Sequence, residues 1–357
     1  MRVFGDGAND APRRRGTVGL AAVVLSIALG LGGSSGTAHA LTINATFDSS
    51  ITSSASASAI ESAITSALGF YSTFFNPVTV NIDYQLAPTG STYLGASQSS
   101  FYLTSYGTYT GAVQADATLY GNSVAQSGYN NLSSGNTAAQ ILATSADYRA
   151  LGFTTPGVLS STGVSGAGTF DGIVYLNASY LTGFGGSGSY TANGVIQHET
   201  DEVLGIGGSG SVLNTMQANG LTSAPSTTGG TYVSPLDLFR YSAPGTASLS
   251  TSATTPSYFS VNGGATSIAG FNQCSTGDYG DWASPGNPCG TSVTSAPLVQ
   301  LAYTGANSPA TLSLSAPEVT ALQAIGYALP ITEPAGLAVF GVALIGLGLG
   351  RRPSRRC

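Results

Sequence analysis

The sequence predicts an α+β fold with a mixed sheet for about residues 41–330, a length that suits one large domain or two small ones. Runs typical of strands come before a charged helical segment at about 191–204. Little regular pattern follows this helix, and the chain contains no internal repeat. Strands, then a central helix, then irregular chain is an order that suits an α+β domain.

The region before the central helix contains well-marked elements. Residues 41–47 alternate apolar and polar side chains, which predicts a strand, and apolar residues recur at helical spacing within 53–70. Pro77 separates this helix from the strand that follows. Further strands are expected at 78–84 and 170–177, and further helices at 108–120 and 138–151.

The central helix follows a glycine-rich loop at 183–188. Thr191 or Asn193 is expected to cap the helix, and Gly205 to end it. The later stretch S-P-L-D-L-F-R-Y, at 234–241, is compact, but its sequence leaves its local form open. A further strand is expected at 258–262 and a last helix at 317–327.

Residues 1–40 are expected to be a secretory signal peptide rather than part of the fold. Three arginines at 13–15 precede an apolar run that extends from residue 18 to about residue 31. Ala38-His39-Ala40 then supplies an A-x-A site, so we expect cleavage after Ala40. An uncut membrane anchor is the alternative, and the choice between the Sec and Tat routes stays open.

Residues 331–357 resemble the PEP-CTERM sorting signal, with Thr332-Glu333-Pro334 in place of Pro-Glu-Pro. The apolar run at 337–350 is shorter than the roughly 20 residues that span a bilayer comfortably. An arginine cluster at 351–356 follows, and such clusters stay on the cytoplasmic side. The resemblance implies transient anchoring, processing by an exosortase-type enzyme, and a Gram-negative envelope, surface or exopolysaccharide setting. An ordinary tail anchor is the alternative.

Charge excludes one class of partner. The chain has no lysine, and only Arg149 and Arg240 lie between residues 41 and 330, together with thirteen acidic residues. The resulting net charge is strongly negative and repels nucleic-acid phosphates. We therefore expect no nucleic-acid binding.

Cys274 and Cys289 enclose a loop that contains Asp278 and Asp281. In an exported chain two such cysteines favour a disulfide, whereas a thiolate metal site would need further Cys or His residues nearby. The two aspartates either bind calcium or are solvated. Cys357 belongs to the tail and is expected to be lost with it.

The central helix carries the strongest functional signal, V-I-Q-H-E-T-D-E-V-L-G. His198 and Glu202 are four residues apart and therefore share one helix face. Glu199 lies beside them, as the general base does in the H-E-x-x-H helix of zinc peptidases. Zinc also accepts carboxylate oxygen, so Glu202 can replace the second histidine. A polar surface helix with this pattern by chance is the alternative.

Several stretches together resemble a family of exported bacterial zincin-like metalloproteases: H-E-T-D-E-V-L-G, D-L-F-R-Y, Y-F-S-V-N-G-G, G-D-Y-G-D-W-A-S and a final A-L-Q-A-I-G-Y. The resemblance extends over about residues 41–328. It implies that His198 and Glu202 bind zinc and that Glu199 is the catalytic base. Gly205 matches a turn of the metzincins, but their third ligand would then fall at Gly208, which has no side chain to bind a metal.

The third ligand must therefore come from elsewhere, and Asp237 in D-L-F-R-Y is our candidate. A turn or cap residue, or an ion-pair partner of Arg240, is its alternative role. Tyr241 is a candidate oxyanion stabiliser, although tyrosines are more often part of the core. Met216 follows the helix as the methionine of a Met-turn would, or simply packs.

The sequence therefore predicts a secreted or cell-surface zinc-dependent peptidase that acts on a peptide or protein substrate through a metal-activated water. Its site would comprise the ligands His198, Glu202 and Asp237 with the catalytic residues Glu199 and Tyr241. The alternative is a non-catalytic envelope or matrix protein on a zincin-like scaffold, since the chain is rich in Ser, Thr, Gly and Tyr and poor in charge.

Overall fold

The structure is a computed structural model that describes residues 40–136, 138–185, 188–218, 232–285, 289, 298–303 and 311–330. These residues form an α+β fold with mixed sheets, as the sequence predicts. The signal peptide expected before Ala40 and the sorting signal expected at 331–357 lie outside the described residues. Among the helices that are described, none is long and apolar enough to cross a membrane.

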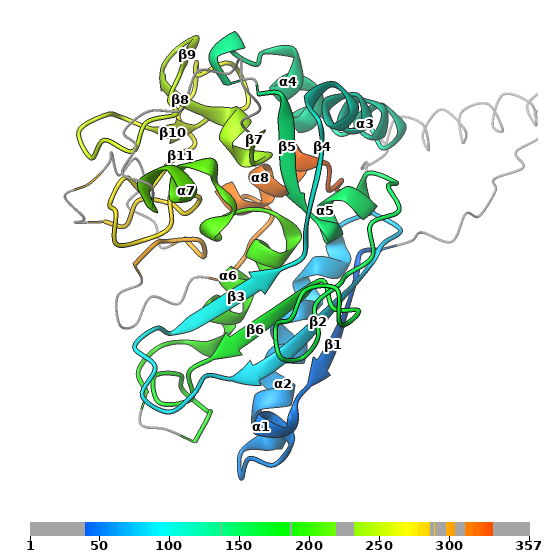
Figure 1. Ribbon diagram of the computed structural model, residues 1–357, viewed down its shortest axis with the longest axis vertical. Helices are drawn as coiled ribbons and strands as arrows, with labels where there is room; N and C mark the ends of the chain where they lie inside the picture. Colours follow the sequence, from blue (N-terminus) through cyan, green and yellow to red (C-terminus); the bar gives the residue numbers. More distant parts are fainter. Residues whose placement is uncertain are drawn as a thin grey trace, which may run out of the picture. The chain divides into compact units, whose positions relative to one another are not determined.

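The first sheet has the strand order β1-β2-β6-β3 (Figure 1). Strands β1, β2 and β6 are parallel, and β3 pairs antiparallel with β6 at the edge. Three of these strands confirm expected ones, but β3 was not expected, because Gly, Ala, Ser and Gln show no strand pattern. The bounds are β1 Thr42–Phe47, β2 Thr79–Leu86, β6 Gly172–Leu176 and β3 Gly95–Ser99.

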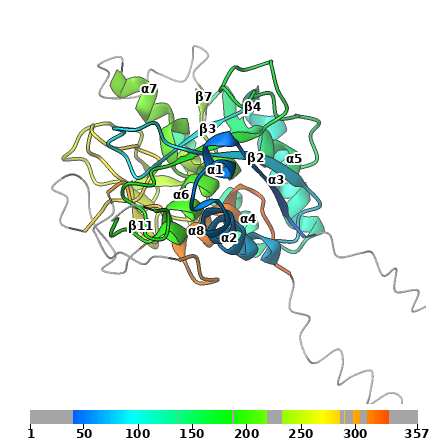
Figure 2. The same ribbon diagram turned by 90° about the horizontal axis from the view of Figure 1, so that it is seen from below.

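Two helices, α2 (Ala57–Leu68) and α6 (Ala192–Leu204), pack on one face of this sheet (Figure 2). Helix α6 crosses β6 at Gly172, where an added Cβ would lie 2.3 Å from a methyl group of Val203. Only glycine permits this close approach, so the sequence of β6 contributes to where the central helix sits.

Two smaller sheets, of order β4-β5-β7 and β11-β10-β8-β9, complete the strands that are described. The second of them contains part of the D-L-F-R-Y stretch, which forms a 3-10 turn followed by β8. Their bounds are β4 Phe101–Ser105, β5 Gln140–Thr144, β7 Tyr232–Val233, β8 Arg240–Ala243, β9 Thr246–Ala247, β10 Tyr258–Phe259 and β11 Ala269–Gly270.

The remaining helices surround these sheets. They are α1 Ser49–Thr52, α3 Tyr106–Leu119, α4 Ser123–Asn130, α5 Ser145–Ala150, α7 Val212–Ala218 and α8 Pro317–Ile325. Short 3-10 turns occur at Gly69–Thr73, Ser134–Asn136, Gly208–Gly210 and Leu236–Phe239.

The helix expected at 138–151 was only half right. Its first part is strand β5, in which Ile141 and Ala143 are buried while the residues next to them are less so. Thr144 then starts α5, because its side-chain oxygen accepts a hydrogen bond from the backbone N–H of Asp147 at 3.2 Å. An N-cap residue in the middle of this segment therefore separates a strand from a short helix, although the pattern of the whole segment is typical of one helix.

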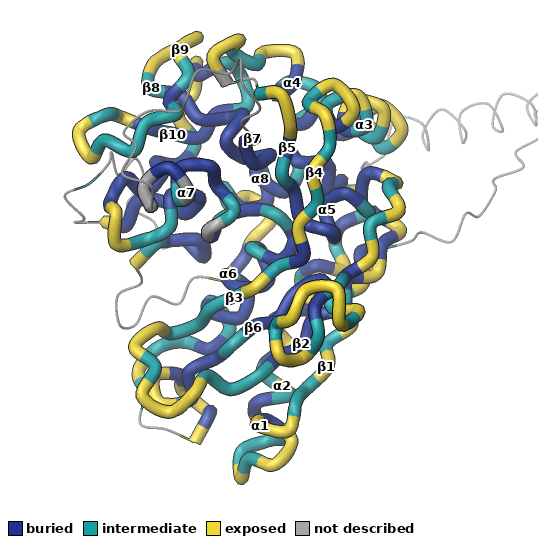
Figure 3. Tube along the Cα trace, in the orientation of Figure 1, coloured by how far each residue is buried: buried dark blue, intermediate teal, exposed yellow. Residues whose placement is uncertain are grey.

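The two arginines of this region are held inside the fold. Arg149 binds both carboxylate oxygens of Asp171, at 2.7 and 2.6 Å. Arg240 is fully buried, donates to the carbonyl of Tyr279 at 2.6 Å, and lies 3.9 Å above the ring of Phe271. Burial lowers its pKa to about 10. Figure 3 shows which parts of the described chain are buried and which are exposed.

Asp116, on the outer helix α3, supports a prediction about stability. Its Oδ2 atom is buried without a hydrogen-bond partner, and burial raises the pKa of its carboxyl to about 7. The folded state therefore prefers the protonated form, and this preference is lost as pH rises from about 4 towards 7. After a discount for solvent screening, we expect Asp116→Asn to stabilise the fold by about 1 kcal/mol at pH 8.

At pH 4 the same substitution should change stability little, because the wild-type carboxyl is then protonated in the folded state. Urea unfolding at the two pH values measures the difference. An equal effect of the substitution at pH 4 and pH 8 would contradict a raised pKa for Asp116.

Candidate metal centre

Helix α6 carries His198, Glu199 and Glu202. Thr191 is its N-cap residue, and Gly205 ends it with a φ of 119°, a left-handed conformation that favours glycine. Both boundaries fall where the sequence predicts them, although the side chain of Thr191 makes no capping hydrogen bond. Apolar side chains of this helix are buried in the core: Val195, Ile196, Val203 and Leu204.

The edge strand β3 passes directly over this helix. An added Cβ at Gly95 would lie 2.5 Å from Oε1 of Glu199 and 2.8 Å from a methyl group of Val195. On the same strand, the hydroxyl of Ser97 donates to Oε2 of Glu202 at 2.5 Å. A glycine and a serine of β3 thus set the position of two carboxylates of α6.

Three ligand atoms converge beside the helix. Nε2 of His198 lies 3.3 Å from Oε1 of Glu202 and 3.8 Å from Oδ2 of Asp281. All three atoms lie within 4.8 Å of one another, the one such group among the residues that the structure describes. Asp281 is buried, whereas His198 and Glu202 remain partly accessible.

The second polar atom of each ligand is already engaged. Nδ1 of His198 lies 2.9 Å from the carbonyl oxygen of Val299, and Oε2 of Glu202 accepts from Ser97. Oδ1 of Asp281 accepts from the backbone N–H of Gly208 at 2.7 Å and from Nε2 of Gln300 at 3.0 Å. Such outer contacts fix ligand orientation and leave Nε2, Oε1 and Oδ2 directed at a common point.

Two of the three separations are close to those of a small metal site. Ligand bonds of 2.0–2.2 Å at tetrahedral angles, as around zinc, place ligand atoms about 3.3–3.6 Å apart. The two separations from His198 are 3.3 and 3.8 Å, and the Glu202–Asp281 separation is within 4.8 Å. One nitrogen and two oxygen ligands would leave a fourth position open, as in catalytic zinc sites.

The site is also rich in uncompensated negative charge. Burial opposes the charge of the His198 imidazole, but the hydrogen bond to Glu202 and the charges of Asp281 and Glu199 raise its pKa well above the usual value. Burial, followed by the charge of Glu202, raises the pKa of Glu199 well above its usual value. Burial also raises the pKa of Asp281 to about 6. A divalent cation would relieve these carboxylates.

Asp281 comes from the loop closed by the disulfide between Cys274 and Cys289, which the structure contains as expected and which suits an exported protein. This loop packs tightly on the chain that follows α6, because an added Cβ at Gly280 would lie 2.6 Å from the carbonyl oxygen of Gly208. Gly208 itself has a φ of 63°, and a Cβ there would lie 2.6 Å from the carboxyl carbon of Glu202. The structure therefore gives Gly208 a backbone role, as a donor to Asp281.

Asp237 lies outside this group of ligand atoms. Its Oδ1 accepts from the hydroxyl of Ser211 at 2.7 Å. Its Oδ2 accepts from the backbone N–H groups of Val212, at 2.9 Å, and Ser234, at 3.0 Å. The structure thus gives Asp237 the cap role that the sequence left open as its alternative, and it places Asp281, rather than Asp237, in the group that could hold a metal.

The other sequence candidates lie in structural positions. Tyr241 is fully buried in β8, and its hydroxyl donates to the carbonyl of Asn131 at 3.3 Å. Met216 is buried in α7, within the core. Asp278 accepts from the side-chain amide of Asn214 at 2.5 Å, and burial together with the charge of Asp281 raises its pKa to about 6.

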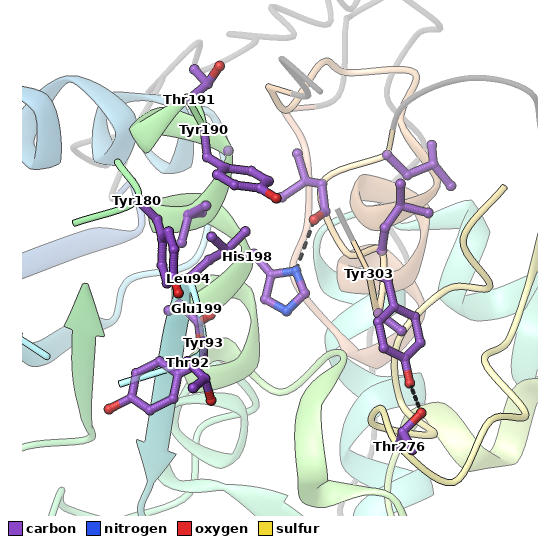
Figure 4. A pocket seen from close by; sticks show the side chains of 17 residues that line it. Thr92, Tyr93, Leu94, Tyr180, Tyr190, Thr191, His198, Glu199, Thr276 and Tyr303 are labelled. Atoms are coloured by element: carbon purple, nitrogen blue, oxygen red, sulfur yellow. Dashed lines mark hydrogen bonds between the residues drawn. The ribbon is translucent and has the colours of Figure 1, made fainter. Parts of the chain in front are cut away.

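Glu199 faces a cavity of about 550 Å³ that opens beside His198 (Figure 4). A smaller cavity of about 140 Å³ reaches Glu202 and Asp237. The candidate base and two of the candidate ligands, His198 and Glu202, therefore line cavities, which a purely structural charge cluster does not require.

Comparison of the chain with protein-family models, with curated proteins and with solved structures found no match. Function must therefore be argued from the geometry of the site.

Sequence reasoning missed the outer contacts and gave Asp281 a different role. Gln300 and Ser97 belong to no recognisable motif, and no sequence pattern indicates a contact to the backbone carbonyl of Val299. Asp281 had been noted only as a calcium-binding or solvated residue. Its position within a disulfide loop, next to Gly280, was the available signal.

Gln300 supports a prediction about metal affinity. It is fully buried, its side chain holds Asp281, and its backbone N–H donates to Oε1 of the buried Glu318 at 3.0 Å. We expect Gln300→Met, which keeps the volume but removes the donor, to weaken zinc binding by about 10–100-fold. Competition with a chromogenic chelator measures this.

A matched control is Gln323→Met on α8, which removes an amide from outside the site. It should leave zinc affinity unchanged. A folded Gln300→Met variant with wild-type affinity would show that Gln300 does not orient Asp281.

Proposed function

We propose that this chain is a zinc-dependent peptidase with a zincin-like site, in which His198, Glu202 and Asp281 hold the metal. One observation carries the proposal: three ligand atoms face one another while the second polar atom of each ligand is engaged elsewhere. Many surface helices contain H-E-x-x-E by chance, and the third ligand from a distant loop is an independent observation that favours a metal site here.

When bound, zinc would supply an activated water and polarise the scissile carbonyl. The residues of the chain provide the rest. His198, Glu202 and Asp281 offer one ligand atom each, and Glu199 extends from the same helix into the adjoining cavity. Its carboxylate can take a proton from the attacking water and return it to the leaving amine. Gly95 of β3 lies against this side chain and, having no Cβ, leaves the room that it needs.

A site with two carboxylates and one imidazole gives the metal more negative charge than an all-histidine site. It should activate water less strongly, so we expect slow turnover. Two cavities, one lined by His198 and Glu199 and the other by Glu202, leave room for a substrate beside the ligand group.

The setting that we propose is extracellular or cell-surface, in the envelope of a Gram-negative bacterium. The disulfide supports export. The sequences of the two termini support it further: a signal peptide would direct the chain out, and an exosortase-type enzyme would process the tail and release it near exopolysaccharide.

The test combines metal content with turnover. Purified chain should contain about one zinc by mass spectrometry and should hydrolyse fluorescein-labelled casein. Chelation should abolish hydrolysis, and added zinc should restore it. A folded chain that binds no zinc would overturn the proposal and favour the non-catalytic envelope protein. Zinc binding without hydrolysis of any protein would leave a metal-binding protein and overturn the peptidase.

A further inference from the structure

The larger cavity has a distinctive lining. Four tyrosines, from separate segments, surround it, and aliphatic side chains form much of the rest. In Figure 4, Tyr93, Tyr180 and Tyr190 stand on one side of the His198 ring, and Tyr303 stands on the other side. The remaining side chains are small, aliphatic or hydroxyl-bearing: Thr92, Leu94, Thr191, Val195, Thr276, Leu298, Val299, Leu301 and Ala302.

The charges around the cavity are as informative as its rings. Among the described residues that line it there is no lysine or arginine, and the only acidic and imidazole groups are Glu199 and His198, at the end next to the ligand atoms. Arg149 and Arg240 are held by internal contacts, so neither is available to the cavity. An acidic side chain bound in the part of the cavity away from His198 would meet no lysine or arginine among the described residues, and a buried unpaired charge is costly.

The volume of the cavity and the kinds of side chain that line it suit one large side chain of a ligand. Its volume of about 550 Å³ falls in the range of sites that enclose small ligands. Tyr93, Tyr180 and Tyr303 are 38%, 37% and 38% exposed, which leaves their rings available to a partner. Tyrosine rings offer edges and faces to an aromatic group, and their hydroxyls tolerate polar atoms at its rim.

We propose that this cavity binds a bulky, uncharged and preferably aromatic side chain of a peptide substrate, next to the bond that is cleaved. The inference rests on the proposed peptidase function, because it places the side chain beside Glu199 and the metal ligands. It assigns the cavity as the specificity site of the enzyme, and it excludes acidic residues there. Lysine is also disfavoured, because Glu199 is the one carboxylate among the described lining residues and its proposed role is to accept a proton from water, so it is not free to pair with an ammonium group.

Matched quenched-fluorescence peptides test the proposal. All have a Ser-, Thr- and Gly-rich sequence and differ at one position, which is occupied by Phe, Leu, Lys or Glu. Two sets of peptides are used, with this position directly before the cleaved bond in one set and directly after it in the other. We expect kcat/KM to fall in the order Phe, Leu, Lys, Glu, with Glu at least about 100-fold below Phe. Equal rates for Phe and Glu, or a preference for Lys, would overturn it.

A charge placed in the cavity should invert this order. Ala302→Arg adds a cation to the lining, so the Glu peptide should be cleaved at least about 10-fold faster than by the wild-type enzyme and the Phe peptide more slowly. Thr92→Arg, at an exposed lining position, gives the same test if the first variant does not fold. Ala115→Arg, exposed on α3 outside the cavity, is the control and should keep the wild-type order.

A binding measurement separates this inference from the peptidase proposal. N-acetyl-phenylalanine amide and N-acetyl-glutamate amide are titrated into the zinc-loaded full chain and followed by ligand-observed NMR. If no peptide is cleaved but the aromatic amide binds and Ala302→Arg weakens it, the cavity assignment stands and the peptidase fails. If both amides bind equally, or neither binds, the cavity assignment fails.

Discussion

Asp281→Ala is expected to reduce bound zinc from about one ion per chain to a small fraction. The substitution removes one of three ligand atoms and leaves the other two, His198 and Glu202, to bind alone. Two ligands cannot complete the three-ligand set of a catalytic zinc site. The measurement is zinc content by mass spectrometry after dialysis against a weak chelator, with the fold checked by circular dichroism.

The informative control is Asp237→Ala. Asp237 was the sequence candidate for the third ligand, but its carboxylate accepts hydrogen bonds from Ser211, Val212 and Ser234. Its loss should lower stability, because these donors lose their partner, yet it should leave zinc content unchanged in the fraction that folds. The opposite result, with zinc kept by Asp281→Ala and lost by Asp237→Ala, would overturn the ligand assignment.

The contrast between these two aspartates shows what the sequence could predict. The helix with His198, Glu199 and Glu202 was predicted with its correct ends, because local rules govern it: helical spacing, an N-cap and a terminal glycine. Two ligands on one helix face follow from helix geometry alone. The third ligand depends on tertiary structure, since it comes from a loop far along the chain.

That loop reaches the helix through backbone contacts that have no sequence signature. The backbone N–H of Gly208 donates to Asp281, and Gly280 packs on the carbonyl oxygen of Gly208. At both positions a Cβ atom would collide with a neighbouring group. The glycines are visible in the sequence, but the chain contains 49 of them, so no single one could be singled out. No sequence pattern favours Asp281 over Asp237 as the third ligand, because the choice depends on where the two loops lie in the fold.

The edge strand illustrates the same limit. Strand β3 is built from small polar residues, and its strand conformation comes from pairing with β6 rather than from propensity. Yet it supplies Gly95, which lies against Glu199, and Ser97, which holds Glu202. Part of the site therefore depends on an element that the local sequence pattern does not predict.

Glu199→Gln should separate chemistry from metal binding. The amide is nearly isosteric with the carboxylate and keeps the packing against Gly95 and Val195, but it cannot take a proton from water. We expect kcat to fall by about 10²–10⁴, the usual contribution of a general base, with KM and zinc content close to wild type. Steady-state kinetics on one cleaved peptide and zinc analysis of the same sample measure both.

The matched control is Glu61→Gln on α2, which makes the same chemical change outside both cavities and should keep the wild-type kcat. Two outcomes would contradict the role of Glu199. Unchanged turnover would mean that another group accepts the proton. Loss of zinc together with activity would mean that Glu199 helps to bind the metal. The residue that acts as the general base would then be unidentified. A fall in kcat with zinc retained fits only a residue that acts on the water and the substrate.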